Sequence, residues 1–310
     1  MKSILITGGL GFIGSNFIKH IYEKYDYNII NVDSVTYAAN PENIPNNILN
    51  SSRYFFAETD INDTNNVRYL VTENSVNYIV NFAAESHVDN SIKDSRPFIE
   101  TNINGTHSLL TLLHDCPSIE RYLQVSTDEV YGSLTEEDDA FTENTPLKPN
   151  SPYSASKASA DLLCRSFYET FNYPILITRC SNNYGPNQHE EKLIPLMIKN
   201  AKSGKKLPVY GDGRNIRDWI YVSDHCSAID AVLHRGRIGE VYNIGGKNEV
   251  RNIDIVKTIL KLLYKSEDQI ELVKDRLGHD WRYGIDNTKI QNELNWVPHV
   301  SFKEGLQKLI

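Results

Sequence analysis

Residues 3–14 read SILITGGLGFIG, an apolar run that meets three glycines spaced as GxxGxxG. The run predicts a buried strand, and residues 12–25 carry the apolar spacing of a helix. A glycine triplet alone would also fit a tight turn, but a strand before it and a helix after it favour nucleotide binding, because the backbone can then approach a pyrophosphate at the helix amino end. The stretch predicts a phosphate cradle at Gly8, Gly11 and Gly14.

Strand and helix patterns alternate along the first 180 residues. Strands are predicted at residues 3–7, 28–32, 53–57, 77–82, 122–125 and 175–178, and long helices at about 97–115 and 153–171. This alternation predicts an α/β fold with a doubly wound parallel sheet of the Rossmann type. We expect residues 1–178 to form the cofactor domain, with returning segments at about 220–245 and 284–296. Residues 179–219, 246–283 and a carboxyl-terminal helix, whose capping box is Ser301 with Glu304, would form a smaller substrate lobe.

Composition excludes several classes of protein. The 310 residues carry 32 basic and 40 acidic side chains, a net charge of −8, which disfavours binding to nucleic acid or to an anionic membrane. No apolar run reaches the roughly 20 residues of a membrane span, and the amino terminus lacks a secretory signal pattern, so we expect a cytoplasmic protein. We expect no metal and no disulfide, because CxxC spacing is absent around Cys116, Cys164, Cys180 and Cys226.

Asp33 ends the second predicted strand. A carboxylate there accepts hydrogen bonds from both ribose hydroxyls and repels a 2′-phosphate, so the predicted cofactor is NAD and not NADP. A turn aspartate is the plain alternative. Asp60 and Ile61, after the third strand, are predicted to flank the adenine.

Tyr153 and Lys157 stand one helical turn apart and share a face. We expect the ammonium to lower the pKa of the phenol, so that the pair exchanges a proton with a sugar hydroxyl. The strand at 122–125 runs into STDEVYG at residues 126–132, which brings Thr127, Asp128 and Glu129 to the carboxyl edge of the sheet, where such folds bind ligands. A solvated acidic loop is the alternative for this segment.

Four segments resemble the extended short-chain dehydrogenases/reductases: TGGLGFIG (7–14), NFAAESHVD (81–89), STDEVYG (126–132) and YSASK (153–157). The resemblance covers nearly the whole chain. Within this superfamily, the Thr-Asp-Glu triplet together with RCSNNYGP (179–186) and RDWIYVSDH (217–225) resembles the dTDP-glucose 4,6-dehydratase family. Nucleotide-sugar epimerases share the cradle and the Tyr/Lys pair but usually lack the adjacent Asp-Glu.

The resemblance implies an NAD-dependent dehydration of dTDP-glucose to the 4-keto-6-deoxy sugar, as a step in rhamnose or other deoxysugar synthesis. Oxidation at carbon 4 acidifies the carbon 5 proton, and loss of water then needs a base at carbon 5 and an acid at the carbon 6 hydroxyl. By resemblance Asp128 is the acid and Glu129 the base, and a hydride returns to carbon 6. Thr127 and Tyr153 would bind the carbon 4 hydroxyl, and Lys157 the nicotinamide ribose.

The remaining predicted site residues bind the cofactor or the substrate. The predicted cofactor site is completed by Phe12, Ile13, Ser34, Thr36, Ala83, Ala84, Thr101 and Asn183. Arg217 is the leading candidate for the substrate diphosphate, because a guanidinium can bind phosphate in a bidentate way, with Lys192 and Arg276 as second choices. The resemblance adds Ser86, Asn182, Leu193, Pro208, Tyr210, Asn252 and His279 to the sugar-nucleotide site.

The sequence departs from the family pattern at a few positions. Asn90 stands where an arginine is usual, and the others are Ala38, Ala39, Leu277 and Trp281. These departures make the nucleotide preference and the shape of the loop at 275–283 less certain to follow the family, because this loop would close over the nucleotide. Two alternatives remain at this stage, a nucleotide-sugar 4-epimerase and a non-enzymatic NAD sensor. The helices at 97–115 and 153–171 carry more apolar surface than one sheet face needs, and the resemblance implies that such helices pair with those of a second copy as a four-helix bundle, so we expect a homodimer.

Overall fold

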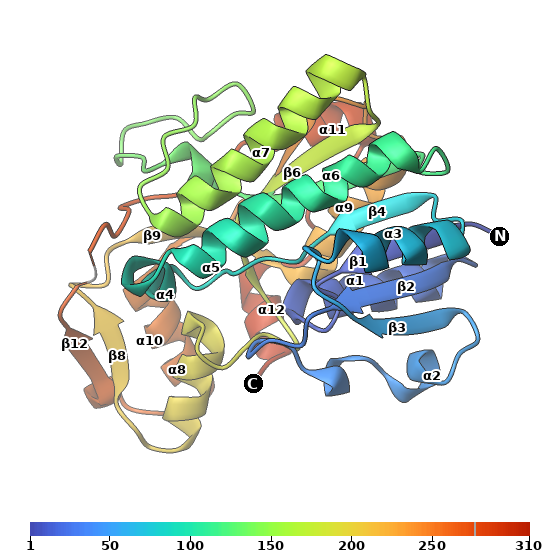
Figure 1. Ribbon diagram of the computed structural model, residues 1–310. Coiled ribbons are helices and arrows are strands. Elements are labelled where there is room, and N and C mark those ends of the chain that lie inside the picture. Colours follow the sequence, from blue (N-terminus) through green and yellow to red (C-terminus); the bar gives the residue numbers. More distant parts are fainter. Residues whose placement is uncertain (276) are drawn as a thin grey trace.

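The computed structural model of the protein describes residues 1–275 and 277–310. At its centre lies a seven-stranded parallel sheet in the order β10-β6-β5-β4-β1-β2-β3 (Figure 1). This confirms the predicted doubly wound parallel sheet. The strands are β1 (Ser3–Thr7), β2 (Asn28–Asp33), β3 (Tyr54–Glu58), β4 (Tyr78–Asn81), β5 (Arg121–Thr127), β6 (Ile175–Cys180) and β10 (Val241–Ile244).

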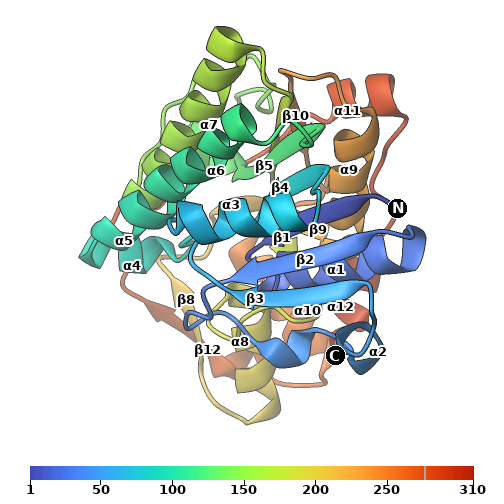
Figure 2. The ribbon, with the colours of Figure 1, turned by 45° about the vertical axis from the view of Figure 1, so that its right-hand side comes forward.

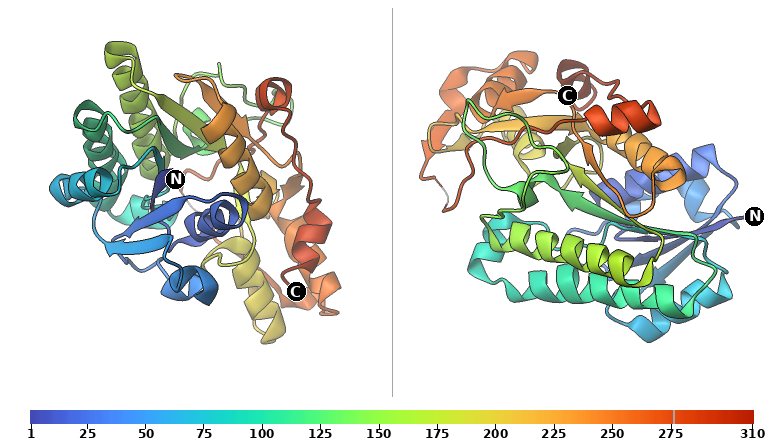
Figure 3. Two further views of the ribbon diagram at one scale, coloured as in Figure 1. Left: turned by 90° about the vertical axis from the view of Figure 1, so that its right-hand side faces the viewer. Right: turned by 90° about the horizontal axis from the view of Figure 1, so that it is seen from above.

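Helices cover both faces of this sheet (Figures 2 and 3). One layer holds α1 (Phe12–Lys24), α9 (Val222–Arg235) and α11 (Thr288–Leu294), and the other holds α3 (Thr64–Glu73), α6 (Thr106–Asp115) and α7 (Pro152–Phe171). The apolar side chains of β1 pack against both helix layers, since Ile4 and Ile6 lie in one core and Leu5 in the other. Burial on both faces explains why this strand lacks an alternating pattern.

The helix predicted at residues 97–115 is not regular. It begins as α5 (Arg96–Phe98), continues as a π-helical segment at Ile99–Gly105, and only then becomes α6. Gly105 lies against Ile61, and a Cβ atom at this position would overlap the isoleucine side chain. Such π-helical turns are common at functional sites.

A third core lies beside the large sheet, at the lower left of Figure 1. It contains α8 (Leu193–Lys202), α10 (Asn252–Leu262) and α12 (Phe302–Gln307), and α12 starts at the predicted capping box of Ser301 and Glu304. Its strands form two small sheets, β7 (Asn182–Tyr184) with β9 (Ile216–Tyr221) and β11 (Glu249–Arg251), and β8 (Leu207–Tyr210) with β12 (Ile270–Val273). The predicted domain boundaries stay a prediction.

The other helices are α2 (Asn46–Leu49) and α4 (Val88–Lys93), and short 3₁₀ turns cover Pro41–Asn43, Asp128–Tyr131 and Glu267–Gln269. Within the two described ranges, none of the helices has both the length and the apolar character needed to cross a bilayer.

Candidate active site

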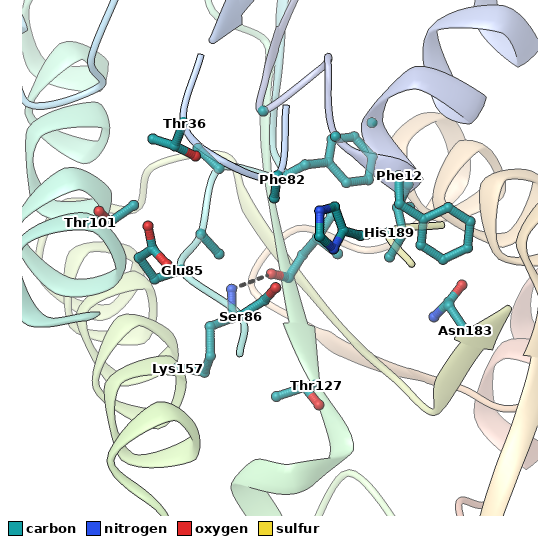
Figure 4. A pocket seen from close by; sticks show the side chains of 18 of the residues that line it. Phe12, Thr36, Phe82, Glu85, Ser86, Thr101, Thr127, Lys157, Asn183 and His189 are labelled. Carbon is teal, nitrogen blue, oxygen red and sulfur yellow. Dashed lines mark hydrogen bonds between the residues drawn. The ribbon is translucent and has the colours of Figure 1, made fainter. Parts of the chain in front are cut away.

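The main cavity opens where the order of the strands reverses. From β1 the chain adds strands on one side through β2 and β3, and from β4 it adds them on the other side through β5 and β6. The loops after β1 and β4 diverge at this switch point, where ligands bind in doubly wound sheets. They border a cavity of about 370 Å³. Figure 4 shows Thr127 at the end of a strand in this cavity, between Lys157 on a helix and Asn183 on the other side.

The glycine cradle has the geometry that a phosphate needs. Gly8 has a φ of +66°, a conformation that disfavours other residues, and its amide donates to the Val32 carbonyl at 2.8 Å. A Cβ atom on Gly14 would overlap the Gly8 carbonyl oxygen. Among the residues that the structure describes, no side chain caps the amino end of α1, so its first amides point at the cavity. The cradle therefore fits a dinucleotide pyrophosphate.

Asp33 is fixed at the end of β2 by two backbone amides. Oδ2 accepts from the Leu10 amide and Oδ1 from the Val35 amide, each at 2.9 Å. Burial raises the pKa of the carboxyl, and the two amides oppose this rise. Each carboxylate oxygen keeps a further acceptor position, as binding of ribose hydroxyls requires. All predicted cofactor residues line the same cavity as Asp33: Gly8, Gly11, Phe12, Ile13, Gly14, Ser34, Thr36, Asp60, Ile61, Ala83, Ala84, Thr101, Tyr153, Lys157 and Asn183.

The Thr-Asp-Glu triplet forms a tight turn at the end of β5. The Thr127 hydroxyl accepts from the Glu129 amide at 3.3 Å and caps the 3₁₀ turn that follows. Asp128 is 1% exposed, and its Oδ1 accepts a hydrogen bond from the Thr127 hydroxyl at 3.4 Å. Burial, followed by the negative charges of Glu129 and Asp218, raises the pKa of Asp128 well above its usual range, although Arg217 acts in the other direction. The protonated form of Asp128 is therefore favoured, as a general acid requires.

Tyr153 and Lys157 face this turn from α7. The helix starts at a reciprocal capping box of Ser151 and Ser154, which sets Tyr153 in the first turn. The Lys157 ammonium donates to the Val125 carbonyl at 2.7 Å. Both side chains line the main cavity with the triplet.

The expected lowering of the Tyr153 pKa was wrong. Burial raises this pKa well above its usual range, the charges of Glu129, Cys180 and Asp128 raise it further, and only a hydrogen bond with Thr127 opposes them. Lys157 does not reverse this effect, because burial lowers its own pKa and its ammonium is bonded to a backbone carbonyl. Sequence spacing shows that the two residues share a face but not how deeply the phenol is buried.

Asn102, which the sequence did not single out, connects two walls of the site. It lies in the π-helical segment, is 1% exposed, and its amide oxygen accepts from the Glu85 amide at 2.9 Å. Its amide nitrogen donates to the Glu85 carbonyl at 3.0 Å and to the Ser156 hydroxyl at 2.8 Å. Ser156 in turn donates to the Tyr153 carbonyl at 2.7 Å. Asn102 thus holds the loop after β4 against the helix that carries the tyrosine.

A smaller cavity of about 50 Å³ adjoins the first and shares Glu129 and Asn182 with it. Arg217 and His279 line it. The guanidinium of Arg217 lies over the Tyr283 ring at 4.2 Å and donates to the carbonyls of Ile216 and Asp280 at 2.7 and 2.9 Å. Its predicted contact with a diphosphate stays a prediction.

The other predicted substrate residues divide into two groups. Ser86, Asn182 and Lys192 line the main cavity. Four others line neither of the two cavities: Leu193, Pro208, Tyr210 and Asn252. Arg276 lies outside the described residues. Lining residues that the predictions missed include Phe82, Glu85, Gln188, His189, Glu191 and Tyr283. Two of these, Phe82 and Glu85, belong to the NFAAESHVD motif, so the motif could have identified them as lining residues.

Comparisons with known proteins match nearly the whole chain. The family model described as GDP-mannose 4,6 dehydratase matches residues 5–309. The low-salt glycan biosynthesis protein Agl12 of Haloferax volcanii is 51% identical over 99% of this chain and 97% of its own. A dTDP-glucose 4,6-dehydratase from Bacillus anthracis, solved in complex with NAD, has a TM-score of 0.93 and 51% identity, covering 99% of this chain and 95% of that one.

The dTDP-glucose 4,6-dehydratase DesIV of Streptomyces venezuelae, solved with NAD and TYD bound, has a TM-score of 0.95 at 44% identity and the same coverage of both chains. The resemblance that the motifs predicted is confirmed, and the chain belongs to the GDP-mannose 4,6 dehydratase family.

Proposed function

We propose that the chain is an NAD-dependent dehydratase that converts dTDP-glucose to dTDP-4-keto-6-deoxyglucose. The observation that carries this proposal is the buried Asp128 carboxyl, whose pKa is raised, beside Glu129 and in one cavity with Thr127, Tyr153 and Lys157. The similarity to dTDP-glucose 4,6-dehydratases, one solved with NAD and one with NAD and TYD, supports the same substrate and cofactor.

The residues of the nucleotide site fit NAD. The amides of the cradle receive the pyrophosphate, and Asp33 accepts the hydroxyls of the adenosine ribose. When bound, NAD supplies the reversible oxidation of the sugar and is restored within each turnover. Lys157, from the base of the cavity, holds the nicotinamide ribose.

The side chains around the sugar carry the proton transfers. In its deprotonated form, which burial makes the minor form, Tyr153 takes the proton of the carbon 4 hydroxyl, and Thr127 orients that hydroxyl. Glu129 then removes the carbon 5 proton, and Asp128 gives its proton to the carbon 6 hydroxyl, which leaves as water. Because this last step requires an acid, burial of Asp128 serves the reaction directly.

The structure gives the rival functions less support. An epimerase oxidises and reduces carbon 4 alone and has no step that needs a protonated carboxyl at this place. A sensor needs the cradle but has no use for Thr127, Tyr153 and Lys157 together.

The proposal also covers the oligomeric state, the location and the pathway of the enzyme. Apolar side chains are exposed along α7 and the π-helical segment, with Leu162 at 56%, Phe171 at 51% and Ile99 at 44%, which supports a homodimer through these helices. A cytoplasmic location, a role in rhamnose or other deoxysugar synthesis, the two-domain division and the diphosphate contact of Arg217 belong to the same proposal.

The test is incubation of the protein with NAD and dTDP-glucose in deuterated water, followed by mass spectrometry and proton NMR of the sugar. Loss of one water with one solvent deuteron at carbon 5 is the expected result. Formation of the galactose isomer without solvent deuterium would identify an epimerase instead. Absence of turnover with dTDP-, UDP- and CDP-glucose would leave the sensor as the better explanation.

A further inference from the structure

Asp218 is a second buried carboxyl near the catalytic acid. It lies in β9, is 1% exposed, and lines neither of the two cavities described above. We propose that Asp218 is a positioning residue for the dehydration, whose buried negative charge keeps the proton on Asp128 until the leaving hydroxyl takes it. This inference rests on the proposed function.

The sheet places Asp218 beside residues that line the active site. β9 pairs in parallel with β7, and Trp219, the next residue along β9, lies opposite Asn182, which lines both cavities. The residue before Asp218 is Arg217, which lines the smaller cavity together with Glu129. The charge of Asp218 is accordingly among those that act on Asp128.

The two carboxyls have unequal hydrogen-bond partners. Asp218 Oδ1 accepts from the Asn248 amide at 2.6 Å, and Oδ2 accepts from the Gly246 amide at 2.9 Å. Asp128 has the Thr127 hydroxyl at 3.4 Å for one oxygen, and its Oδ2 has no partner among the described residues. Of two neighbouring buried carboxyls, the one with more donors ionises first and disfavours ionisation of the other.

The directions in which burial shifts the two pKa values agree with this division. Burial raises the pKa of Asp218 to about 6 against the effect of its two amides, whereas the pKa of Asp128 lies well above its usual range. At neutral pH Asp218 is therefore mostly charged, and the rise in the pKa of Asp128 favours its protonated form. Glu129 acts on Asp128 in the same direction as Asp218, whereas Arg217 and Thr127 act in the other. The raised pKa values of the nearby Tyr153 and Cys180 disfavour their charged forms.

A purely structural role is the alternative to test against. The Asp218 carboxylate holds the turn at residues 245–248 against β9 through two hydrogen bonds. Loss of these hydrogen bonds alone would lower activity by the same factor at every pH. A loss of charge near Asp128 has a different signature. It lowers the pKa of the acid, so activity is lost at a lower pH on the alkaline side of the profile.

The experiment compares Asp218→Asn with the matched control Asp224→Asn. Asp224 is also buried and accepts two backbone amides, those of His299 and Val300 at 2.8 Å each, but it is not among the charges that act on Asp128. We expect the alkaline limb of kcat/KM for dTDP-glucose to move down by about one pH unit in Asp218→Asn and to stay in place in Asp224→Asn. A uniform loss at all pH values in Asp218→Asn would overturn the inference.

A second measurement needs no turnover and no variant of Asp218. Carbon-13 NMR of aspartate carboxyls in the wild-type protein, with Asp128 assigned through Asp128→Asn, should show Asp218 ionising near pH 6 while Asp128 stays protonated at neutral pH. An ionised Asp128 at pH 7 would refute the inference. Failure of the wild type to dehydrate dTDP-glucose would refute the proposed function, and the NMR result would still decide the coupling of the two carboxyls.

Discussion

Replacing Asn102 by alanine tests how the catalytic helix is held. The change removes three hydrogen bonds of 2.8 to 3.0 Å from a side chain that is 1% exposed. The amide and carbonyl of Glu85 lose their partner, and a buried backbone group without one costs about 1–3 kcal/mol. The Ser156 hydroxyl keeps its bond to the Tyr153 carbonyl, so we expect the free energy of unfolding to fall by about 3 kcal/mol in total.

The assay combines urea unfolding with steady-state kinetics. Asn104→Ala is the matched control, because Asn104 lies in the same π-helical segment but is exposed and bonds the Glu100 carboxylate. The control should change stability by no more than about 0.5 kcal/mol. In Asn102→Ala, kcat/KM should also fall at least about tenfold, since the loop after β4 and the helix of Tyr153 lose their common support. Equal effects of the two substitutions would refute the reasoning.

Three further predictions concern the acid-base pair, the cradle and the packing of α1. Asp128→Asn and Glu129→Gln should still reduce bound NAD but form product about 10² times more slowly, as stopped-flow absorbance and product analysis would show; unchanged product formation would contradict their roles. Gly14→Ala should weaken NAD about tenfold in calorimetric titration, because its methyl group displaces the Gly8 carbonyl; unaltered affinity would contradict the cradle. Asp230→Asn should cost about 3 kcal/mol at pH 7 in urea unfolding, with wild type and variant converging in acid.

The last prediction follows from the contacts of Asp230, which joins α1 to α9. Burial raises the pKa of this carboxyl, but bonds from His20, His234, Lys24 and Tyr25 outweigh burial and lower it. A carboxyl with a lowered pKa stabilises the fold above its ordinary value near 4, and this stabilisation is lost as the pH falls toward the lowered one. A difference between wild type and variant that does not shrink in acid would contradict the assignment.

The parallel sheet and the nucleotide cradle could be predicted from sequence because their signals are local. An apolar strand, three glycines and a helix pattern within residues 3–25 specify the first unit, and Asp33 follows at the end of the next strand. The π-helical segment could not be predicted in this way. Its bonding depends on distant contacts, of Gly105 with Ile61 and of Asn102 with Glu85, which no periodicity contains.

In the candidate site, too, the sequence predicted local features better than features that depend on the whole fold. Thr127, at the end of β5, lies on the main cavity. Of the residues assigned through the family resemblance, Ser86 and Asn182 lie on a cavity, whereas Pro208 and Asn252 lie on neither. The direction of the Tyr153 pKa was missed because burial depends on the whole fold, while the spacing to Lys157 is a property of one helix.

The difference between Asp128 and Glu129 is likewise a property of position and not of residue type. Both follow Thr127 in one tight turn and line the main cavity, yet Asp128 is buried at 1% exposure, whereas Glu129 also borders the smaller cavity. An inward carboxyl among other carboxyls cannot ionise easily and becomes a proton donor, while its neighbour on the cavity wall is placed to act as a base. The turn at the end of β5 therefore creates an acid and a base from two adjacent residues, and the charge behind it at Asp218 helps to keep the two roles apart.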